Sequence, residues 1–240
     1  RLLVGRNTLA VHVRHQSPNS RWYSGAGIYR DVTLHVLPKR HIPLDGVYVT
    51  TTHELESWTM TIDTELCGVK DNGVLTHVLL DGDVPVCDVT VEAAGDHANA
   101  VMQVLSPKLW SPESPFLYDI TYRLVNAKGE VLDEVNSYAG MRKVHIEGNK
   151  ICLNNKPYYQ RLVLDQGFYP DGIWTAPSDE ALKRDIELSM AAGFNGARLH
   201  QKAFEERFYY WADRLGYITW GEAPSWGMDA NGIGAARNFL

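Results

Sequence analysis

The sequence predicts a multidomain protein in which β domains precede an α/β segment, and three observations support this prediction. Seven short alternating runs, separated by turn signals, occupy residues 41–139. After residue 145, apolar runs alternate with two amphipathic helical patterns. The segment 194–201 lies between those helical patterns and ends in polar side chains. In parallel α/β architectures, such side chains at the carboxyl ends of strands form the functional site.

Residues 1–38 carry two alternating segments, 9–13 and 32–36, that are typical of strands. A glycine-broken aromatic stretch, 20–30, lies between them. Two or three strands do not form a stable domain alone. We therefore expect these segments to be the C-terminal strands of a sheet whose opening strands lie outside the chain.

Residues 41–139 are expected to form a seven-stranded sandwich of the immunoglobulin-like type, because short strands recur at its characteristic spacing. Its most plausible role is structural, since no cluster of functional side chains stands out in it. The predicted strands are 46–52, 57–66, 73–80, 88–93, 100–105, 117–125 and 131–137.

Residues 145–240 show strand–helix–strand alternation, beginning with a candidate parallel strand at 158–164. The first helix is expected from the N-cap Ser178 to Gly193, and the second ends at Gly216. A third apolar run, 217–220, follows. This spacing is that of a (β/α)8 barrel, which needs about 250 residues. We therefore expect only its first three strands and two helices.

Composition excludes several classes of protein. The net charge of −6 argues against a nucleic-acid-binding surface, which needs clustered basic residues. No apolar run reaches the length of about 18 residues that a membrane span requires. The first residue is Arg1, so any signal peptide would lie outside the sequence, and the compartment stays open.

The cysteines and histidines give no metal-binding pattern. Cys67, Cys87 and Cys152 are widely spaced, which favours buried free thiols, although a Cys67–Cys87 disulfide stays open. The proximity of His200 to Glu205 or Glu206 is read as coincidence. We expect no metal and no cofactor.

Four segments, in order, resemble glycoside hydrolase family 2, the group of β-galactosidases, β-glucuronidases and β-mannosidases. Residues 21–32 look like the signature at the end of the family's jelly-roll domain, and 109–118 look like the motif of its sandwich domain. Residues 140–142 with 153–157 are similar to the entry into its catalytic barrel. Residues 196–201 and 220–222 resemble its second and third barrel strands.

The resemblance implies a retaining enzyme that acts on a carbohydrate substrate with two glutamates. One belongs to an Asn-Glu pair after the fourth barrel strand, and the other follows the seventh. This chain contains no Asn-Glu pair. Both catalytic glutamates are therefore expected beyond Leu240, and the chain alone is expected to be inactive. Homo-oligomerisation stays open, as does a rival function as a non-catalytic carbohydrate-binding or scaffolding module.

The candidate binding residues follow the three predicted parallel strands. Arg198 and His200 share one strand face by the period of two, and Gln201 follows them. The resemblance implies that His200 lines the sugar pocket, while Arg198 is expected to orient a carboxylate. Asp165 and Gln166 follow the first strand, where the family often has an Asn-Arg-His run that this chain lacks. Asp165 is expected to accept from a sugar hydroxyl, with capping or ion pairing as the alternative.

Glu222, after the third strand, is expected to support the pocket, as the resemblance implies. One alternative makes Asp165 and Glu222 an inverting pair, because strands two spacings apart lie roughly 9.6 Å from each other. It is disfavoured, since a general acid needs burial to raise its pKa. Trp174 and Trp226 lie on loops, where they are expected to stack on sugar rings or to pack against the rim of the barrel.

Overall fold

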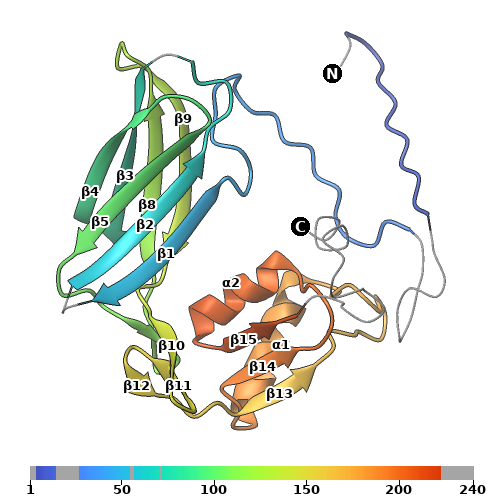
Figure 1. Ribbon diagram of the computed structural model, residues 1–240. Coiled ribbons are helices and arrows are strands. Elements are labelled where there is room, and N and C mark those ends of the chain that lie inside the picture. Colours follow the sequence, from blue (N-terminus) through green and yellow to red (C-terminus); the bar gives the residue numbers. More distant parts are fainter. Residues whose placement is uncertain (1–3, 15–26, 55–56, 71, 223–240) are drawn as a thin grey trace.

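The computed structural model describes residues 4–14, 27–54, 57–70 and 72–222, and these residues form a mostly β structure with two helices. Figure 1 shows a β-rich part joined through a small hairpin to a part that contains both helices. The mostly β architecture with few helices agrees with the sequence prediction. In the described residues, no helix has the length and apolar character needed to cross a membrane.

Two antiparallel sheets, here called the two-sheet unit, enclose one hydrophobic core. The seven predicted strand segments all coincide with strands of these sheets, although two of the strands begin several residues earlier than expected. The first sheet has the order β1-β2-β5, with β1 Val47–Glu54, β2 Ser57–Glu65 and β5 His97–Val104. The second has the order β4-β3-β8-β9, with β4 Val84–Ala93, β3 Gly73–Asp81, β8 Tyr118–Val125 and β9 Val131–Ala139.

The core of the two-sheet unit follows from strict alternation along its strands. In β2 and β8, every second side chain points inward, because successive side chains of a strand face opposite sides. Met60 and Ile62 of one sheet therefore belong to the same buried cluster as Leu79 and Tyr122 of the other. Burial raises the pKa of the Tyr122 phenol.

Short strands connect the two-sheet unit to the rest of the chain. One pair lies within the 109–118 segment, and a small antiparallel sheet of order β10-β11-β12 follows β9. These strands are β6 Trp110–Ser111, β7 Ser114–Pro115, β10 Val144–Glu147, β11 Lys150–Leu153 and β12 Lys156–Pro157.

The remaining described residues form a parallel three-stranded sheet covered by two helices, here called the parallel unit. Its strands pair in the order β13-β14-β15 and are separated along the chain by α1 and α2, which is the predicted alternation. Gly196 is required in β14, because a Cβ there would overlap the backbone of Ile218. The elements are β13 Leu162–Asp165, α1 Asp179–Ala191, β14 Gly196–Leu199, α2 Glu206–Leu215 and β15 Ile218–Gly221.

The helices begin and end as their sequences predict. The Ser178 hydroxyl accepts a hydrogen bond from the backbone N–H of Ala181 at 3.2 Å, which caps α1. Asp179 in the first turn accepts two hydrogen bonds from Arg207 of α2, at 2.9 and 2.8 Å. These bonds lower the pKa of Asp179 to about 2 and link the two helices. Gly216 ends α2 with a φ of 79°.

The strands expected at 9–13 and 32–36 are not formed among the described residues, and the assignment of residues 1–38 to the end of a jelly-roll sheet stays a prediction. Both segments lack strand pairing, and their apolar side chains are exposed; Leu34 is 80% exposed. The alternating pattern fits a strand, but a strand also needs a neighbouring backbone to satisfy its N–H and C=O groups. The described residues provide no such neighbour for these segments. Residues 15–26 lie outside the described residues.

The cysteines are all free, so the Cys67–Cys87 disulfide that the sequence left open is absent. Only Cys152 is a buried thiol; Cys67 is exposed and Cys87 is half-buried. The expectation of three buried thiols therefore holds for one of them.

Asp213 of α2 joins the parallel unit to the two-sheet unit. Its carboxylate accepts hydrogen bonds from Arg142 at 2.9 Å and from the Tyr138 hydroxyl at 3.3 Å. Its backbone carbonyl accepts a third from the indole N–H of Trp110 at 2.7 Å. The Arg142 guanidinium also lies 4.7 Å from the centre of the Trp110 ring. A single helical residue thus receives three donors from the β-rich part of the chain.

We predict that Asp213→Ala lowers the free energy of unfolding by about 1–3 kcal/mol, because it removes two charge-assisted bonds and leaves Arg142 and Tyr138 without this acceptor. Urea denaturation measures the change. Glu134→Ala is the matched control, since the Glu134–Arg123 pair is more exposed and should contribute less than about 1 kcal/mol. Equal losses in the two variants would contradict this account of the junction.

We also predict that Gly216→Ala is more destabilising than Gly193→Ala. Both glycines have positive φ, so alanine costs backbone strain at either position. Only at Gly216 would the new Cβ overlap the carbonyl oxygen of Pro112, whereas nothing lies within 4 Å at Gly193. The difference in unfolding free energy should be at least about 1 kcal/mol. Equal denaturation midpoints for the two variants would contradict the predicted overlap between the new Cβ and the Pro112 carbonyl.

Candidate functional site

The three parallel strands bring the sequence-predicted residues to one edge of the sheet. In register, Asp165 of β13 lies beside Leu199 of β14, which lies beside Gly221 of β15. His200 and Glu222 directly follow the last two of these positions. The carboxyl ends of parallel strands therefore meet here, as the sequence predicts.

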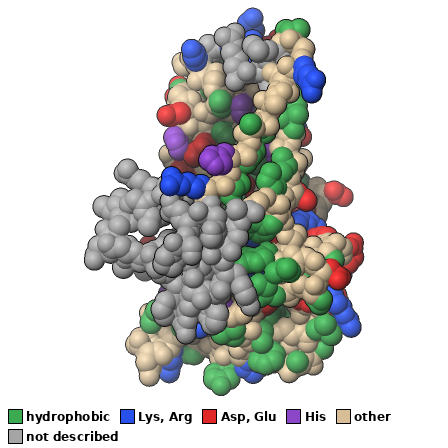
Figure 2. Space-filling model, turned by 90° about the vertical axis from the view of Figure 1, so that its right-hand side faces the viewer, with side chains coloured by type: hydrophobic (Ala, Val, Ile, Leu, Met, Phe, Trp, Pro, Cys, Tyr) green, Lys and Arg blue, Asp and Glu red, His purple; other side chains and the backbone are tan. Residues whose placement is uncertain are grey.

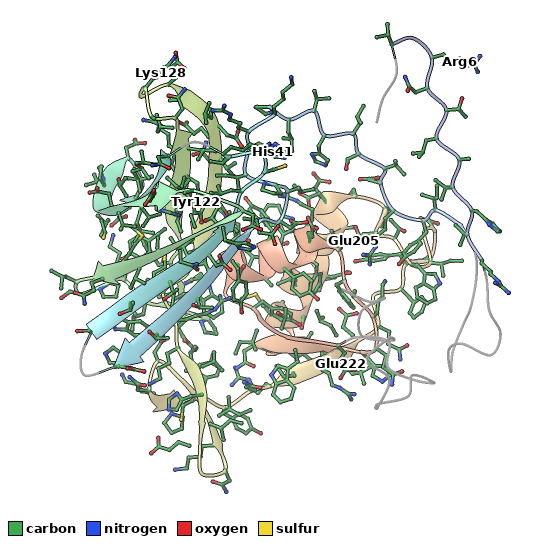
Figure 3. All side chains as sticks on the ribbon, turned by 45° about the horizontal axis from the view of Figure 1, so that its top comes forward. Arg6, His41, Tyr122, Lys128, Glu205 and Glu222 are labelled. Atoms are coloured by element: carbon green, nitrogen blue, oxygen red, sulfur yellow. The ribbon has the colours of Figure 1, made fainter. Side chains whose placement is uncertain are left out.

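Glu222 is held by Arg198 and Gln201. The Arg198 Nε–H donates to one carboxylate oxygen, and the backbone N–H of Gln201 donates to the other at 3.0 Å. Gln201 has a φ of 52°, a left-handed conformation at the turn where its N–H meets the carboxylate. The hydrogen bond from Arg198 is the main cause of the lowered pKa of Glu222. Figure 3 shows Glu222 at the end of β15.

Gln166 and His200 form a second polar pair at the same edge. The Gln166 amide nitrogen lies 3.0 Å from His200 Nδ1. An amide nitrogen only donates, so Nδ1 of His200 accepts in this arrangement. The backbone N–H of His200 donates to the carbonyl of Asp165 at 2.8 Å, which fixes the backbone of His200. The contact with Gln166 and the backbone bond to Asp165 therefore hold His200 at this edge.

Asp165 lies on the helix-facing side of the sheet, so its expected contact with a sugar hydroxyl is not favoured. Alternation along β13 places Asp165 on the same side as Val163, which packs against the core under the helices. Its carboxylate accepts from the N–H of Gly167 at 2.8 Å, and burial raises its pKa. This is the capping role that the sequence left open.

The hypothetical inverting pair of Asp165 and Glu222 is likewise not favoured by the structure. Asp165 faces the helix layer, whereas Glu222 bonds to Arg198, which projects from the opposite, exposed face of β14. The lowered pKa of Glu222 also keeps it ionised, and both of its oxygens are engaged. The structure therefore does not bring Asp165 and Glu222 together as a catalytic pair.

Lys202 is a site residue that the sequence analysis did not identify. Its side chain is buried, and its ammonium group donates to the carbonyls of Gly167 at 2.5 Å and Trp174 at 3.0 Å. The ammonium also lies 5.3 Å from the centre of the Phe204 ring. Burial is the main cause of its lowered pKa. The lysine thus connects the loop after β13 to the segment after β14, a role for which a single lysine in sequence gives no signal.

Of the two tryptophans expected at the site, Trp174 lies among the described residues. Trp174 is half-buried, and its ring centre lies 5.5 Å from that of Phe168 and 6.3 Å from that of Tyr29. This packing supports the alternative in which Trp174 forms part of the rim. Trp226, the other tryptophan expected at the site, lies outside the described residues.

The two hollows that can be described lie away from this edge of the sheet. Each has a volume of about 430 Å³; one lies beside β11 and one between β3, β8 and β9, and none of the predicted site residues lines them. On the face shown in Figure 2, basic side chains are scattered singly among other types. The arrangement can bind and orient hydroxyl groups, but it does not offer two cooperating carboxyl groups.

Three comparisons relate the chain to known proteins. The family model described as glycosyl hydrolases family 2 matches residues 41–142. A β-galactosidase of Photobacterium profundum is 29% identical over 92% of this chain, which spans 23% of that protein. A putative β-glucuronidase of Formosa agariphila is 28% identical over 92% of this chain and 22% of its own length. The chain thus covers less than a quarter of either relative.

A solved structure shows the same similarity. A glycosyl hydrolase family 2 member from Bacteroides cellulosilyticus superposes with a TM-score of 0.75 and 28% identity, over 88% of this chain and 30% of that one. The sequence relatives and this structure extend the similarity well beyond the residues that the family model matches, to nine-tenths of the chain. The chain therefore matches the model of glycosyl hydrolases family 2 over residues 41–142 and resembles a solved member of that family over most of its length.

Proposed function

We propose that the chain is part of a retaining β-glycosidase that hydrolyses a β-linked sugar. In this proposal the two-sheet unit is an immunoglobulin-like sandwich, and the parallel unit is the beginning of a (β/α)8 barrel. The parallel register of β13, β14 and β15, with α1 and α2 on one side, supports the barrel. The similarity to a β-galactosidase and a putative β-glucuronidase supports the class of reaction.

The polar edge of the parallel sheet carries this proposal. Arg198 and Gln201 hold Glu222, while Gln166 holds His200, whose ring can form a hydrogen bond with a sugar hydroxyl. Side chains fixed by such supporting bonds lose little entropy when they bind a ligand. In this role Glu222 positions Arg198 and the Gln201 backbone and takes no part in bond cleavage.

Retaining hydrolysis requires two carboxyl groups about 5–5.5 Å apart, one as acid/base and one as nucleophile. The described residues of this edge offer Asp165 and Glu222 on opposite faces of the sheet. We therefore propose that both catalytic glutamates come from outside these 240 residues. They would act on the sugar that the polar edge binds.

The Glu222–Arg198 pair predicts a specific pH response. The folded-state pKa of Glu222 lies below its ordinary value of 4.5, so the pair stabilises the fold above that pH. The contribution is lost as the pH falls through the lowered pKa, because protonation removes the charge. In Arg198→Gln, a carboxyl-detected NMR titration should show the pKa of Glu222 moving upward. Arg207→Gln is the control, and a Glu222 titration that shifts equally in both variants would refute the assignment.

We predict that His200→Ala in the full-length enzyme lowers kcat/KM on aryl β-glycosides by about 10- to 100-fold, since one substrate hydrogen bond is lost. His97→Ala is the matched control, because His97 is exposed on β5 and should leave kcat/KM unchanged. The 240-residue chain itself should show no turnover.

Two results would count against this function. Turnover by the 240-residue chain that disappears in Glu222→Gln would make Glu222 catalytic. Sugar binding by the chain that is unaffected by His200→Ala and is lost through changes in the two-sheet unit would instead favour a non-catalytic carbohydrate-binding module.

A further inference from the structure

Three side chains able to ligate a metal lie together on the hairpin formed by β10 and β11, away from the polar edge. His145 pairs directly with Cys152 across the hairpin, and Glu147 lies two residues along β10 from His145. Opposed residues, and residues two apart in one strand, project from the same face of a sheet. One ligand atom from each of His145, Glu147 and Cys152 lies within 4.8 Å of the other two.

The burial of this group points to a ligand. The Cys152 side chain is fully buried, and His145 Nδ1 is shielded from solvent without a hydrogen-bond partner among the described residues. A buried nitrogen left in this state destabilises the fold. Native structures rarely leave such atoms unsatisfied unless a water molecule or an ion binds there. A metal ion would accept the Nδ1 lone pair directly.

The base of the hairpin is anchored, so two of the ligands are positioned in advance. The Asn154 side chain accepts from the N–H of Lys143 at 3.0 Å and donates to the carbonyl of Trp110 at 3.0 Å. The N–H of Asn154 donates to the carbonyl of Lys143 at 2.8 Å. These bonds flank the His145–Cys152 pair. Glu147 is exposed next to the turn and can adjust its rotamer.

We propose that the His145 imidazole, the Glu147 carboxylate and Cys152 Sγ bind a thiophilic divalent cation of the zinc class. A thiolate and an imidazole favour Zn²⁺ or Co²⁺ over Mg²⁺ and Ca²⁺, which prefer oxygen ligands. Metal–ligand bonds of about 2.0–2.3 Å place tetrahedral ligands closer together than 4.8 Å, so binding draws the three groups inward. The Cys152 thiol releases its proton to solvent on coordination, and a water molecule completes four ligands.

Sequence patterns do not indicate this site, because the separations from His145 to Glu147 and from Glu147 to Cys152 match no usual zinc spacing. Antiparallel pairing brings Cys152 opposite His145 and creates the cluster. A bound cation would link β10 to β11 close to the point where the chain leaves the two-sheet unit for β13. It would therefore stabilise this connection and need not take part in sugar chemistry.

Titration of the reduced, metal-free chain with Co²⁺, followed by competition with Zn²⁺, tests the proposal. One equivalent of Co²⁺ should bind and show the thiolate-to-metal absorption band together with tetrahedral d–d bands. Zn²⁺ should displace it, and the melting temperature should rise when either metal binds. Cys152→Ala should abolish the thiolate band. His145→Gln and Glu147→Gln should each weaken binding by about 100-fold or more, because loss of even a supporting residue costs about 10–100-fold.

Cys67→Ser is the matched control, since it removes an exposed thiol outside the cluster and should leave the spectrum unchanged. Glu147→Gln changes an exposed side chain, so loss of folding would not account for its effect. The near-ultraviolet circular dichroism of each metal-free variant checks that it folds. A Co²⁺ spectrum without the thiolate band would overturn the proposal, as would binding that persists at full affinity in Glu147→Gln and Cys152→Ala.

Discussion

The position of α2 depends on the contacts of Asp213, and the polar edge depends in turn on the position of α2. Three donors from the β-rich part of the chain converge on this residue. At the C-terminal end of the same helix, Gly216 lies so close to Pro112 that no side chain fits. α2 packs through Phe208 and Ala212 on the core that also contains Leu199 of β14. The strand ends that carry His200 and Glu222 are therefore held in a fixed relation to the two-sheet unit.

Within the polar edge, Asp165, Glu222 and Lys202 each have polar partners among the described residues. Arg198 keeps Glu222 ionised, and Lys202 is held by the carbonyls of Gly167 and Trp174. The buried ammonium group of Lys202 links the loop after β13 to the segment after β14, and this link restrains both segments. A sugar-binding surface needs such rigid side chains. A general acid needs a carboxyl group that has a raised pKa and faces the substrate.

Much of the fold could be predicted from local sequence patterns, and the exceptions have physical causes. Strands such as β2 and β8 were predictable because alternation there coincides with burial against a second sheet. Segments 9–13 and 32–36 alternate equally well, yet they form no strands among the described residues, since pairing depends on a neighbour that alternation does not reveal. The end of α2 was predictable, because Gly216 supplies the positive φ that a helix end needs.

The sequence predicts the candidate site correctly where residues only need to follow neighbouring parallel strands. It does not predict the direction in which a side chain points. The grouping of Arg198, Gln201 and Glu222 follows from parallel register. The orientation of Asp165 toward the helices depends on which face of β13 packs against them, and only the packing of Val163 in the folded structure reveals that face. The burial of Lys202 and the meeting of His145 with Cys152 depend on long-range packing and strand pairing.

The central claim is that this chain supplies sugar-binding side chains and no catalytic carboxylate. Trapping the glycosyl-enzyme intermediate of the full-length protein with a 2-fluoro β-glycoside, followed by peptide mass spectrometry, tests it most directly. The account predicts that the trapped sugar is attached to a glutamate outside these 240 residues. A sugar attached to Glu222 or Asp165 would contradict it.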